Sequence, residues 1–276
     1  MAEPPLSPAA ALVRRLDPVQ FRAALFAAEP ARERLMVLAA FDIELSRAVA
    51  RAPGREEGPL LAAMRLQFWR DRVEEAGSDT TPAADHEVAG PLHALLSGPL
   101  APDREAALSL VDARHAELEA PLDRAAWEAW ARARFEAWHR LALRALDLLD
   151  PEAALAAGRL AAASFALRHA RAMAREGATL IPDLDEDARA ALAAGRPSEG
   201  AGRAIATLAA IGREAATALH ARRPALGRAA TPAMLPLGRD RRVIAAAEAG
   251  ATPDHLAAIP APGALPQLWT ALSGRW

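Results

Sequence analysis

The chain has 276 residues, of which 52% are apolar, and this length is sufficient for one substantial hydrophobic core. All 33 basic residues are arginine, and they balance 35 acids to a net charge of -2, which argues against a nucleic-acid-binding protein. The chain contains no cysteine, which excludes disulfides, thiolate metal ligands and cysteine nucleophiles.

Residues that favour helices dominate the sequence. Alanine is abundant, strand formers are few and tyrosine is absent, so we predict an all-α fold. Apolar residues at three- and four-residue spacing, interrupted by Pro, Gly and Asp-Pro, indicate roughly eight helices. The predicted helices cover residues 17–27, 31–52, 59–76, 91–98, 103–120, 123–149, 151–177 and 198–223. We expect one helical domain with a core at about 17–220 and a less regular segment at about 225–276.

Common catalytic motifs are missing from this helical pattern. No two of the seven histidines have the i, i+4 spacing with a nearby carboxylate that is typical of a helical zinc site. Ser46, Ser109 and Ser164 lie within predicted helices and lack the Gly-x-Ser-x-Gly elbow of a hydrolase. We therefore expect no metal, no cofactor and no serine triad.

Two aromatic patterns have both a structural and a functional interpretation. One stripe follows the predicted helix at 123–149 and is more typical of a core than of a ligand cage; its members are Trp127, Trp130, Phe135 and Trp138. The segment "RLQFWRDRVEE" gathers Arg65, Trp69 and Arg72 with three acids over a few helical turns. Taken alone, this second pattern indicates a charged helix face with internal ion pairs.

Four segments together resemble, in order and spacing, the squalene/phytoene synthase family of head-to-head prenyl synthases. They are "FRAALFAAEPARERLMVLAAF", "MRLQFWRDRVEE", "VAGPLHALL" and "AAGRLAAASFALRHARAMAREGATLIPD". The resemblance implies an isoprenoid-synthase-like helical bundle around a central cavity. In such enzymes, two facing helices carry aspartate-rich motifs that hold magnesium ions, and these ions bind and ionise an allylic diphosphate.

Both aspartate motifs lack their acids in this sequence. By this resemblance, the first motif falls on Ser46, Arg47 and Ala50, and the second falls on His169 and Met173. We expect Arg47 and His169 to repel Mg²⁺ instead of coordinating it. The resemblance therefore implies a prenyl-synthase-like protein that cannot ionise a prenyl diphosphate.

A non-catalytic branch of the family, the synthase-like assembly factors of mitochondrial respiratory complex I, is similar at "AFDIEL" and "MRLQFW". The matching positions are Phe41, Glu44, Leu45, Met64, Arg65, Gln67, Phe68 and Trp69. This likeness implies a pseudo-enzyme that assists the assembly of respiratory complex I. Its partners would be subunits of that complex or its other assembly factors.

Two alternatives stay open at this point. The first is a binding module that holds an anionic lipid or a prenyl diphosphate without turnover, because guanidinium groups bind phosphate bidentately. The candidate binding residues for a ligand or partner are Arg47, Arg65, Trp69, Arg168, His169 and Arg175. The second is an active squalene/phytoene-type transferase, which would need acids elsewhere in the cavity, and the sequence shows no pair at suitable spacing.

The sequence also bears on location. No apolar run approaches the roughly 18 residues that cross a bilayer, and the N-terminal stretch does not resemble a signal peptide. Together with an arginine bias typical of a GC-rich genome, this favours a bacterial cytoplasmic protein, with a peripheral contact to the inner membrane left open. Trp269 and Trp276 would either anchor at a membrane interface or pack on the bundle, and packing is favoured.

Overall fold

The computed structural model describes residues 5–50, 58–78, 86–118, 123–274 and 276, and these residues form helices and connections without a strand. The helices are α1 (Pro8–Leu16), α2 (Pro18–Ala24), α3 (Ala31–Val49), α4 (Gly58–Glu75), α5 (Ala89–Ser97), η1 (Ala101–Asp103), α6 (Arg104–Leu118), α7 (Arg124–Ala131), η2 (Arg132–Glu136), α8 (Ala137–Ala145), α9 (Pro151–Arg175), α10 (Glu186–Ala194), α11 (Glu199–Leu226), η3 (Gly227–Ala230), α12 (Thr231–Met234), α13 (Leu237–Glu248), α14 (Pro253–Ala258) and α15 (Ala264–Ser273). The prediction of an all-α fold is confirmed.

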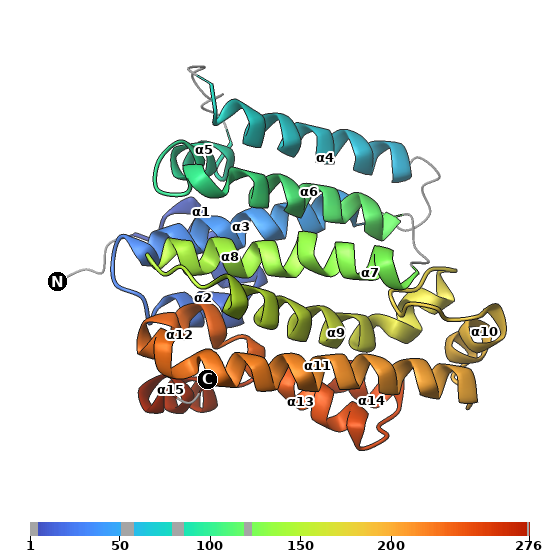
Figure 1. The fold of residues 1–276 in the computed structure, drawn as a ribbon. Coiled ribbons are helices and arrows are strands. Elements are labelled where there is room, and N and C mark those ends of the chain that lie inside the picture. The colour runs from blue at the N-terminus through green and yellow to red at the C-terminus, as the bar shows by residue number, and fades with distance from the viewer. Residues whose placement is uncertain (1–4, 51–57, 79–85, 119–122, 275) are drawn as a thin grey trace.

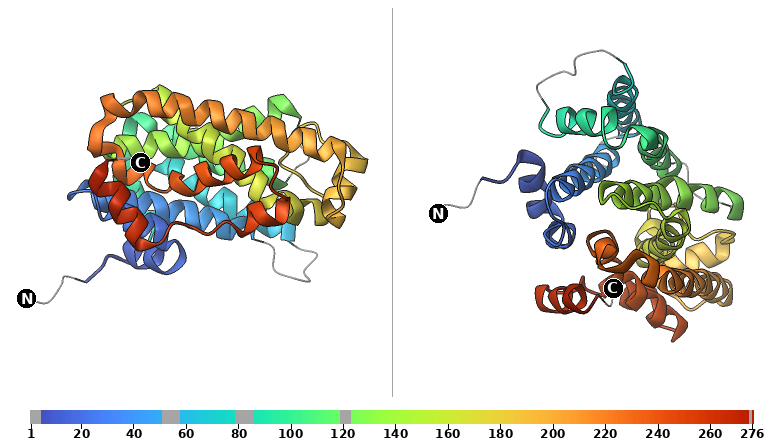
Figure 2. Two further views of the ribbon diagram at one scale, coloured as in Figure 1. Left: turned by 90° about the horizontal axis from the view of Figure 1, so that it is seen from below. Right: turned by 60° about the vertical axis from the view of Figure 1, so that its left-hand side comes forward.

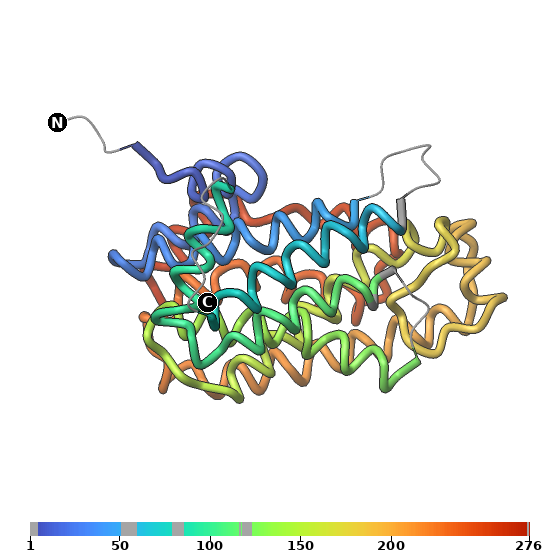
Figure 3. Tube along the Cα trace, turned by 90° about the horizontal axis from the view of Figure 1, so that it is seen from above, coloured from blue at the N-terminus to red at the C-terminus, as the bar shows by residue number. Residues whose placement is uncertain are grey.

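The long helices form a bundle with α9 in its middle (Figure 1). Helix α9 contacts α8, α10, α11, α13 and α14, so both halves of the chain pack against it. Helix α3 packs against α1, α4, α6 and α8 on the other side of the bundle, and Figure 3 shows α3 and α4 running side by side. Figure 2 shows the same bundle from two further directions.

Local sequence explains the length and close packing of α9. The Asp150 carboxylate accepts the backbone N–H of Ala153 at 2.9 Å, and Pro151 occupies the first helical position, so the start of the helix is well defined. Most of its buried residues are alanine, which allows neighbouring helices to approach closely. At Gly158 the approach is closest, because a Cβ atom there would lie 2.4 Å from the backbone nitrogen of Glu136.

The neighbour that meets Gly158 is a π-helical turn. Helices α7, η2 and α8 follow one another without a break, and η2 forms the π turn at Arg132–Glu136. The sequence predicted one regular helix over 123–149, so the position of the π turn was missed. Single π turns inside α-helices are frequent at functional sites. Here the turn contacts α9 and carries Arg134 and Phe135, which both line a cavity.

The structure also contains helices that the sequence pattern did not predict. Helix α1 begins at Pro8 after the N-cap Ser7, and α14 begins at Pro253 after the N-cap Thr252. In both helices the proline stands at the start, where its missing N–H is tolerated. The segment at 225–276, predicted to be less regular, holds α12 to α15. Residues 51–52 and 119–120, at the ends of two predicted helices, lie outside the described residues.

The two C-terminal tryptophans have different environments. Trp276 is buried, and its indole Nε1 donates to the carbonyl oxygen of Gly227 at 3.4 Å. Trp269 is 71% exposed. The predicted packing is therefore confirmed for Trp276 and wrong for Trp269. Within the described part of the chain, no helix is long and apolar enough to cross a membrane.

Substitution of Gly158 tests the contact between α9 and the π turn. The Gly158→Ala variant is expected to lower the free energy of unfolding by about 1–3 kcal/mol, because its Cβ would clash with backbone atoms of Phe135 and Glu136. Gly202 in α11 has open space around it, so Gly202→Ala is the matched control and should be neutral or stabilising. Urea denaturation measures both, and equal stabilities would contradict this packing.

Candidate functional site

The elements around the π turn enclose a cavity of about 250 Å³. Its lining comes from the α1–α2 junction, α2, α3, η2, α8, α9 and the start of α13. The lining residues are Asp17, Gln20, Ala39, Asp42, Ile43, Arg134, Phe135, Trp138, His139, Ala161, Phe165, Arg168, Pro236, Leu237 and Asp240. Aromatic side chains and charged groups thus line one partly open cavity.

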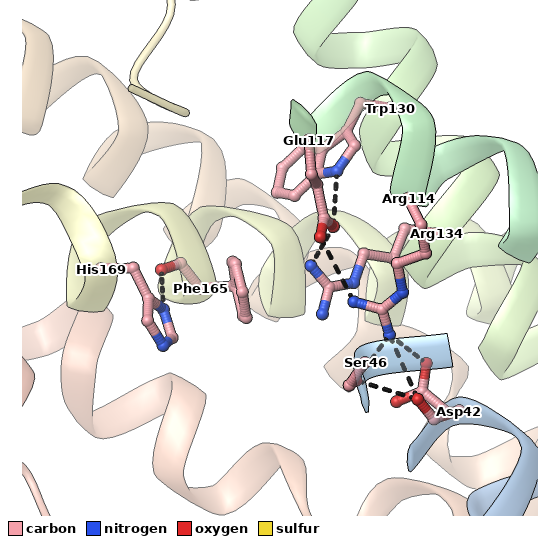
Figure 4. A network of polar contacts seen from close by, with 8 residues as sticks. All are labelled: Asp42, Ser46, Arg114, Glu117, Trp130, Arg134, Phe165 and His169. Carbon is pink, nitrogen blue, oxygen red and sulfur yellow. Dashed lines mark hydrogen bonds and ion pairs between the residues drawn. The ribbon is translucent and has the colours of Figure 1, made fainter. Parts of the chain in front are cut away.

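A buried guanidinium lies beside α3. Arg114 on α6 is 2% exposed, and its Nη2 donates to Asp42 Oδ1 at 2.7 Å and to Ser46 Oγ at 3.0 Å (Figure 4). Its Nη1 donates to Glu117 Oε2 at 3.4 Å. The Ser46 hydroxyl in turn donates to the Asp42 carbonyl oxygen at 2.9 Å. Ser46, which the resemblance places at the first position of the first motif, is therefore a hydrogen-bond partner of an arginine.

A second guanidinium, that of Arg134, lies on the other side of Glu117. Glu117 accepts hydrogen bonds from Arg134 and, at 3.1 Å, from the indole Nε1 of Trp130. Arg134 also lies over two aromatic rings, 4.2 Å from the ring centroid of Phe165 and 4.9 Å from that of Phe135. Glu117 thereby connects α6 to α7 and η2, and Arg134 connects η2 to α9 (Figure 4).

Burial and neighbouring charges act on both arginines. Burial and, to a lesser extent, the positive charge of Arg114 lower the pKa of Arg134 to about 10, although Glu117 opposes both. Burial also disfavours the charged form of Arg114, but the carboxylates of Asp42 and Glu117 raise its pKa above the usual value. Both guanidiniums are therefore positively charged at neutral pH.

A second polar cluster lies where α9 meets α13. The Ser164 hydroxyl donates to Asp240 Oδ1 at 2.5 Å, and Arg168 Nη2 lies 3.9 Å from the same oxygen. Burial raises the pKa of Asp240 to about 6, although the hydrogen bond from Ser164 and the charge of Arg168 oppose this shift. The pKa of Arg168 is itself lowered by burial.

The predicted motif positions do not form one cluster. Ser46 contacts Arg114, whereas Arg47 is exposed and pairs with Glu44 at 2.6 Å, and Ala50 is exposed just after α3 ends. The first-motif positions of α3 thus face both the interior and solvent.

The second-motif positions lie on α9. The ring of His169 stacks on Phe165 with centroids 4.1 Å apart, and its Nδ1 is 2.8 Å from the Phe165 carbonyl oxygen. Burial lowers the pKa of His169, so the ring is neutral at neutral pH. Met173 is half-buried against the core. The expectation that Arg47 and His169 repel a cation is therefore wrong, because the charged groups beside Ser46 and Phe165 are Arg114 and Arg134.

The other predicted binding residues divide among three places. Arg168 lines the cavity, and Arg175 at the end of α9 is exposed and donates to the Ala193 carbonyl oxygen at 3.3 Å. Arg65, Trp69 and Arg47 line a separate hollow of about 330 Å³ at α3 and α4, and the remaining lining residues are Glu44, Ala48, Phe68 and His86. Within the described residues, the structure thus brings Arg47 and Arg65 together but separates them from Arg168 and His169.

Several residues of the site were missed by sequence reasoning. The predicted core role of the aromatic stripe is confirmed for Trp127 and Trp130, which are buried, while Phe135 and Trp138 line the cavity. The charged residues that were missed are Asp17, Arg114, Glu117, Arg134 and Asp240. The one available signal was the Arg-x-x-Glu spacing at 114 and 117 on a predicted helix, which is also common on solvated helix faces.

The carboxylates of the cavity do not form a magnesium site. Three acids line it, but Asp42 pairs with Arg114, and Asp240 accepts from Ser164. The third, Asp17, accepts the backbone N–H groups of Val19 and Gln20 as the N-cap of α2, and burial raises its pKa. Among the residues that the structure describes, no group of three His, Cys, Asp or Glu side chains is arranged to hold a metal ion. The residues present do not fit the metal clamp that the family resemblance implies.

Comparisons with known proteins identify the family of this chain. The sequence profile of the squalene/phytoene synthase family matches residues 13–165, which is more than half of the chain, so the chain belongs to this family. The match ends before the second-motif positions at 169 and 173. The crystal structure of squalene synthase HpnC from Alicyclobacillus acidocaldarius is similar with a TM-score of 0.64 and 17% sequence identity, and the match covers 88% of this chain and 90% of that one. This likeness confirms the isoprenoid-synthase fold. No curated protein matches the sequence.

Removal of the Glu117 charge tests the buried network. Glu117→Gln leaves two buried guanidiniums without a shared counter-charge and is expected to lower the free energy of unfolding by about 3–5 kcal/mol. Glu199→Gln is the control, because Glu199 forms an exposed ion pair with Arg203 on α11 and should change stability little. Urea denaturation at pH 7 compares them. A loss in Glu117→Gln as small as that of the control would contradict the coupling.

The raised pKa of Asp240 predicts a dependence of stability on pH. Its folded pKa of about 6 lies above the usual value of 3.8, so the folded state binds more protons than the unfolded state between about pH 4 and 6. The free energy of unfolding should therefore fall as pH rises through this window, by roughly 2–3 kcal/mol from this group. Asp240→Asn should remove the fall, and the difference between the two proteins, measured from pH 4 to pH 8, isolates the contribution. A constant difference would contradict it.

Proposed function

We propose that this chain is a non-catalytic member of the squalene/phytoene synthase family that assists assembly of respiratory complex I. The observation that carries the loss of catalysis is the hydrogen bond from the buried Arg114 guanidinium to Ser46, at the first position of the first motif. A carboxylate at this position would serve the family's magnesium chemistry. Here the position holds a hydroxyl, and its partner is a cation.

Electrostatics supports this reading. Magnesium requires oxygen ligands, and its binding is opposed by fixed positive charge nearby. Arg114 and Arg134 are both charged at neutral pH and both contact Glu117, so a metal ion would have to displace buried ion pairs. Without a metal, the leaving-group charge of an allylic diphosphate has no clamp to stabilise it. An active transferase is accordingly the least favoured reading.

The surface of α4 supports a role in protein binding. Leu60, Met64 and Phe68 recur every four residues on one face of α4, and all three are exposed, Met64 by 62%. Trp69 from the same "MRLQFW" segment is buried, and its ring lies 5.4 Å from that of Phe41. We name Leu60, Leu61, Met64, Arg65 and Phe68 the α4 face. An apolar face of this kind, bordered by the hollow that Arg47 and Arg65 line, is typical of an interaction surface.

The identity of the partner rests on the sequence resemblance alone. The "AFDIEL" and "MRLQFW" segments resemble those of the complex I assembly factors, and the second of them supplies Met64, Arg65 and Phe68 of the α4 face. The proposed partners are therefore complex I subunits or other assembly factors of that complex. The two segments also contact each other, because Phe41 from the first packs against Trp69 from the second.

The second candidate is a module that holds an anionic lipid or a prenyl diphosphate without turnover. The observation in its favour is that Arg134 and Arg168 line the same cavity as Phe135, Trp138 and Phe165, which suits a ligand with an anionic head and an apolar tail. The volume of about 250 Å³ counts against a long prenyl chain, since pockets for drug-sized ligands measure roughly 300–1,000 Å³.

Affinity capture tests the proposal. The tagged chain, expressed in its own host, is captured from detergent-treated membranes, and the captured proteins are identified by mass spectrometry. Complex I subunits or assembly factors should be enriched, and Met64→Asp/Phe68→Asp should reduce this enrichment at least about tenfold, because charges on the α4 face disrupt an apolar interface. Leu149→Asp is the control, since Leu149 is equally exposed but lies between α8 and α9.

Three outcomes would overturn parts of this proposal. Capture without complex I proteins would remove that choice of partner. Stoichiometric, Mg²⁺-dependent diphosphate release from farnesyl or geranylgeranyl diphosphate would show that the chain is an enzyme. A prenyl lipid that co-purifies with the protein and is lost in Arg168→Gln would favour the binding module.

A further inference from the structure

Helix α15 has two chemically distinct sides. Its inner side packs on the bundle through Gln267 and Ala271, which are buried, and Ala271 forms a small apolar cluster with Ala23 of α2 and Leu235. Arg22 of α2 reinforces this contact, because its Nε donates to Gln267 Oε1 at 2.6 Å. Helix α15 is therefore a fixed part of the structure and lies beside α2 at one end of the bundle (Figure 2).

The outer side of α15 is apolar and uncovered. Its residues Leu265, Leu268, Trp269 and Leu272 recur at the i, i+3, i+4 and i+7 spacing of one helix face. Leu265 is 79% exposed and Leu272 is 61% exposed, and the Trp269 indole extends the same face. A contiguous set of large apolar side chains in water is unfavourable, so such a face marks an interaction site.

Arginine side chains lie close to α15. The helix itself contains no charged residue, and the sequence from 255 to 276 contains no acid. Several arginines border the helix and the segment that leads into it. Arg242 donates to the Pro260 carbonyl oxygen at 2.6 Å, Arg223 donates to that of Gly274 at 2.7 Å, and the exposed Arg228 lies against Gly274. Together with Arg22, which contacts Gln267 on the inner side, these arginines place positive charge beside the helix.

We infer that the outer face of α15 is a membrane contact that lies in the interface of a bilayer rich in anionic lipids. An apolar helix face with Leu and Trp, flanked by cationic side chains, is the composition that binds such a surface. Tryptophan favours the headgroup region, where its indole ring meets both apolar and polar surroundings. At ten residues α15 is about 15 Å long, which is half of a bilayer core, so it lies along the surface.

Vesicle binding tests this inference without any protein partner, so its outcome is independent of the proposed function. The full chain is mixed with vesicles of phosphatidylglycerol and phosphatidylcholine in equal parts, or of phosphatidylcholine alone, and bound protein is measured by co-sedimentation. Binding is expected to the anionic vesicles and to be at least about tenfold weaker with neutral ones. The emission of Trp269 is obtained by subtracting the spectrum of Trp269→Phe from that of the unaltered chain. This difference spectrum should shift to shorter wavelength when anionic vesicles are added.

Matched variants make the test specific to α15. Leu268→Ser/Trp269→Ser is expected to weaken binding to anionic vesicles at least about tenfold, and Arg228→Gln severalfold. Met64→Ser/Phe68→Ser on α4 is the control and should bind as the unaltered chain does. Thermal unfolding by circular dichroism verifies that each variant is folded. The inference is overturned if the unaltered chain does not bind anionic vesicles, or if the folded α15 variant binds as well as the α4 control.

Discussion

Two buried guanidiniums that share one carboxylate are the constraint on which the centre of this structure depends. Glu117 on α6 contacts both Arg114 and Arg134, and each arginine then reaches a different helix. Arg114 fixes α3 through Asp42 and Ser46, and Arg134 fixes α9 through the ring of Phe165. Because a buried charge without a partner is costly, these helices are held in one arrangement. The π turn at η2 belongs to this arrangement, since it carries Arg134.

The same network decides what kind of ligand the cavity could accept. In the family's enzymes, the resemblance implies acids on two facing helices with metal ions between them. Here the interior face of α3 presents Ser46 and Asp42 to a guanidinium, and α9 presents Phe165 to another. The remaining acids are engaged in capping α2 or in the contact between α9 and α13. The carboxylates of Asp42 and Glu117 are already paired with guanidiniums and are not free to hold Mg²⁺, which is the physical link between this network and the proposed loss of catalysis.

The sequence predicted those features of the fold that a local pattern of residues determines. Alanine content and apolar spacing predicted the all-α fold, and helices such as α3 and α9 lie close to their predicted ranges. The ionic network could not be predicted, because Arg114 and Asp42 are 72 residues apart and only packing brings them together. The π turn was missed for a related reason, since its position depends on the close approach of α9 at Gly158. The "MRLQFW" segment likewise predicted a role in assembly, but it did not indicate which of its residues face solvent.

The two exposed apolar faces lie on opposite sides of the molecule. Helix α4 runs along one side of the bundle, and α15 lies on the other, beyond α9 and α11 (Figure 1, Figure 2). Neither face can cover the other within one chain, so the two proposed contacts use separate surfaces. A bilayer bound at α15 would leave the α4 face directed away from the lipid, where it is reached from the aqueous side. A chain bound to a membrane through α15 could then bind a protein at α4, because the two contacts use different surfaces.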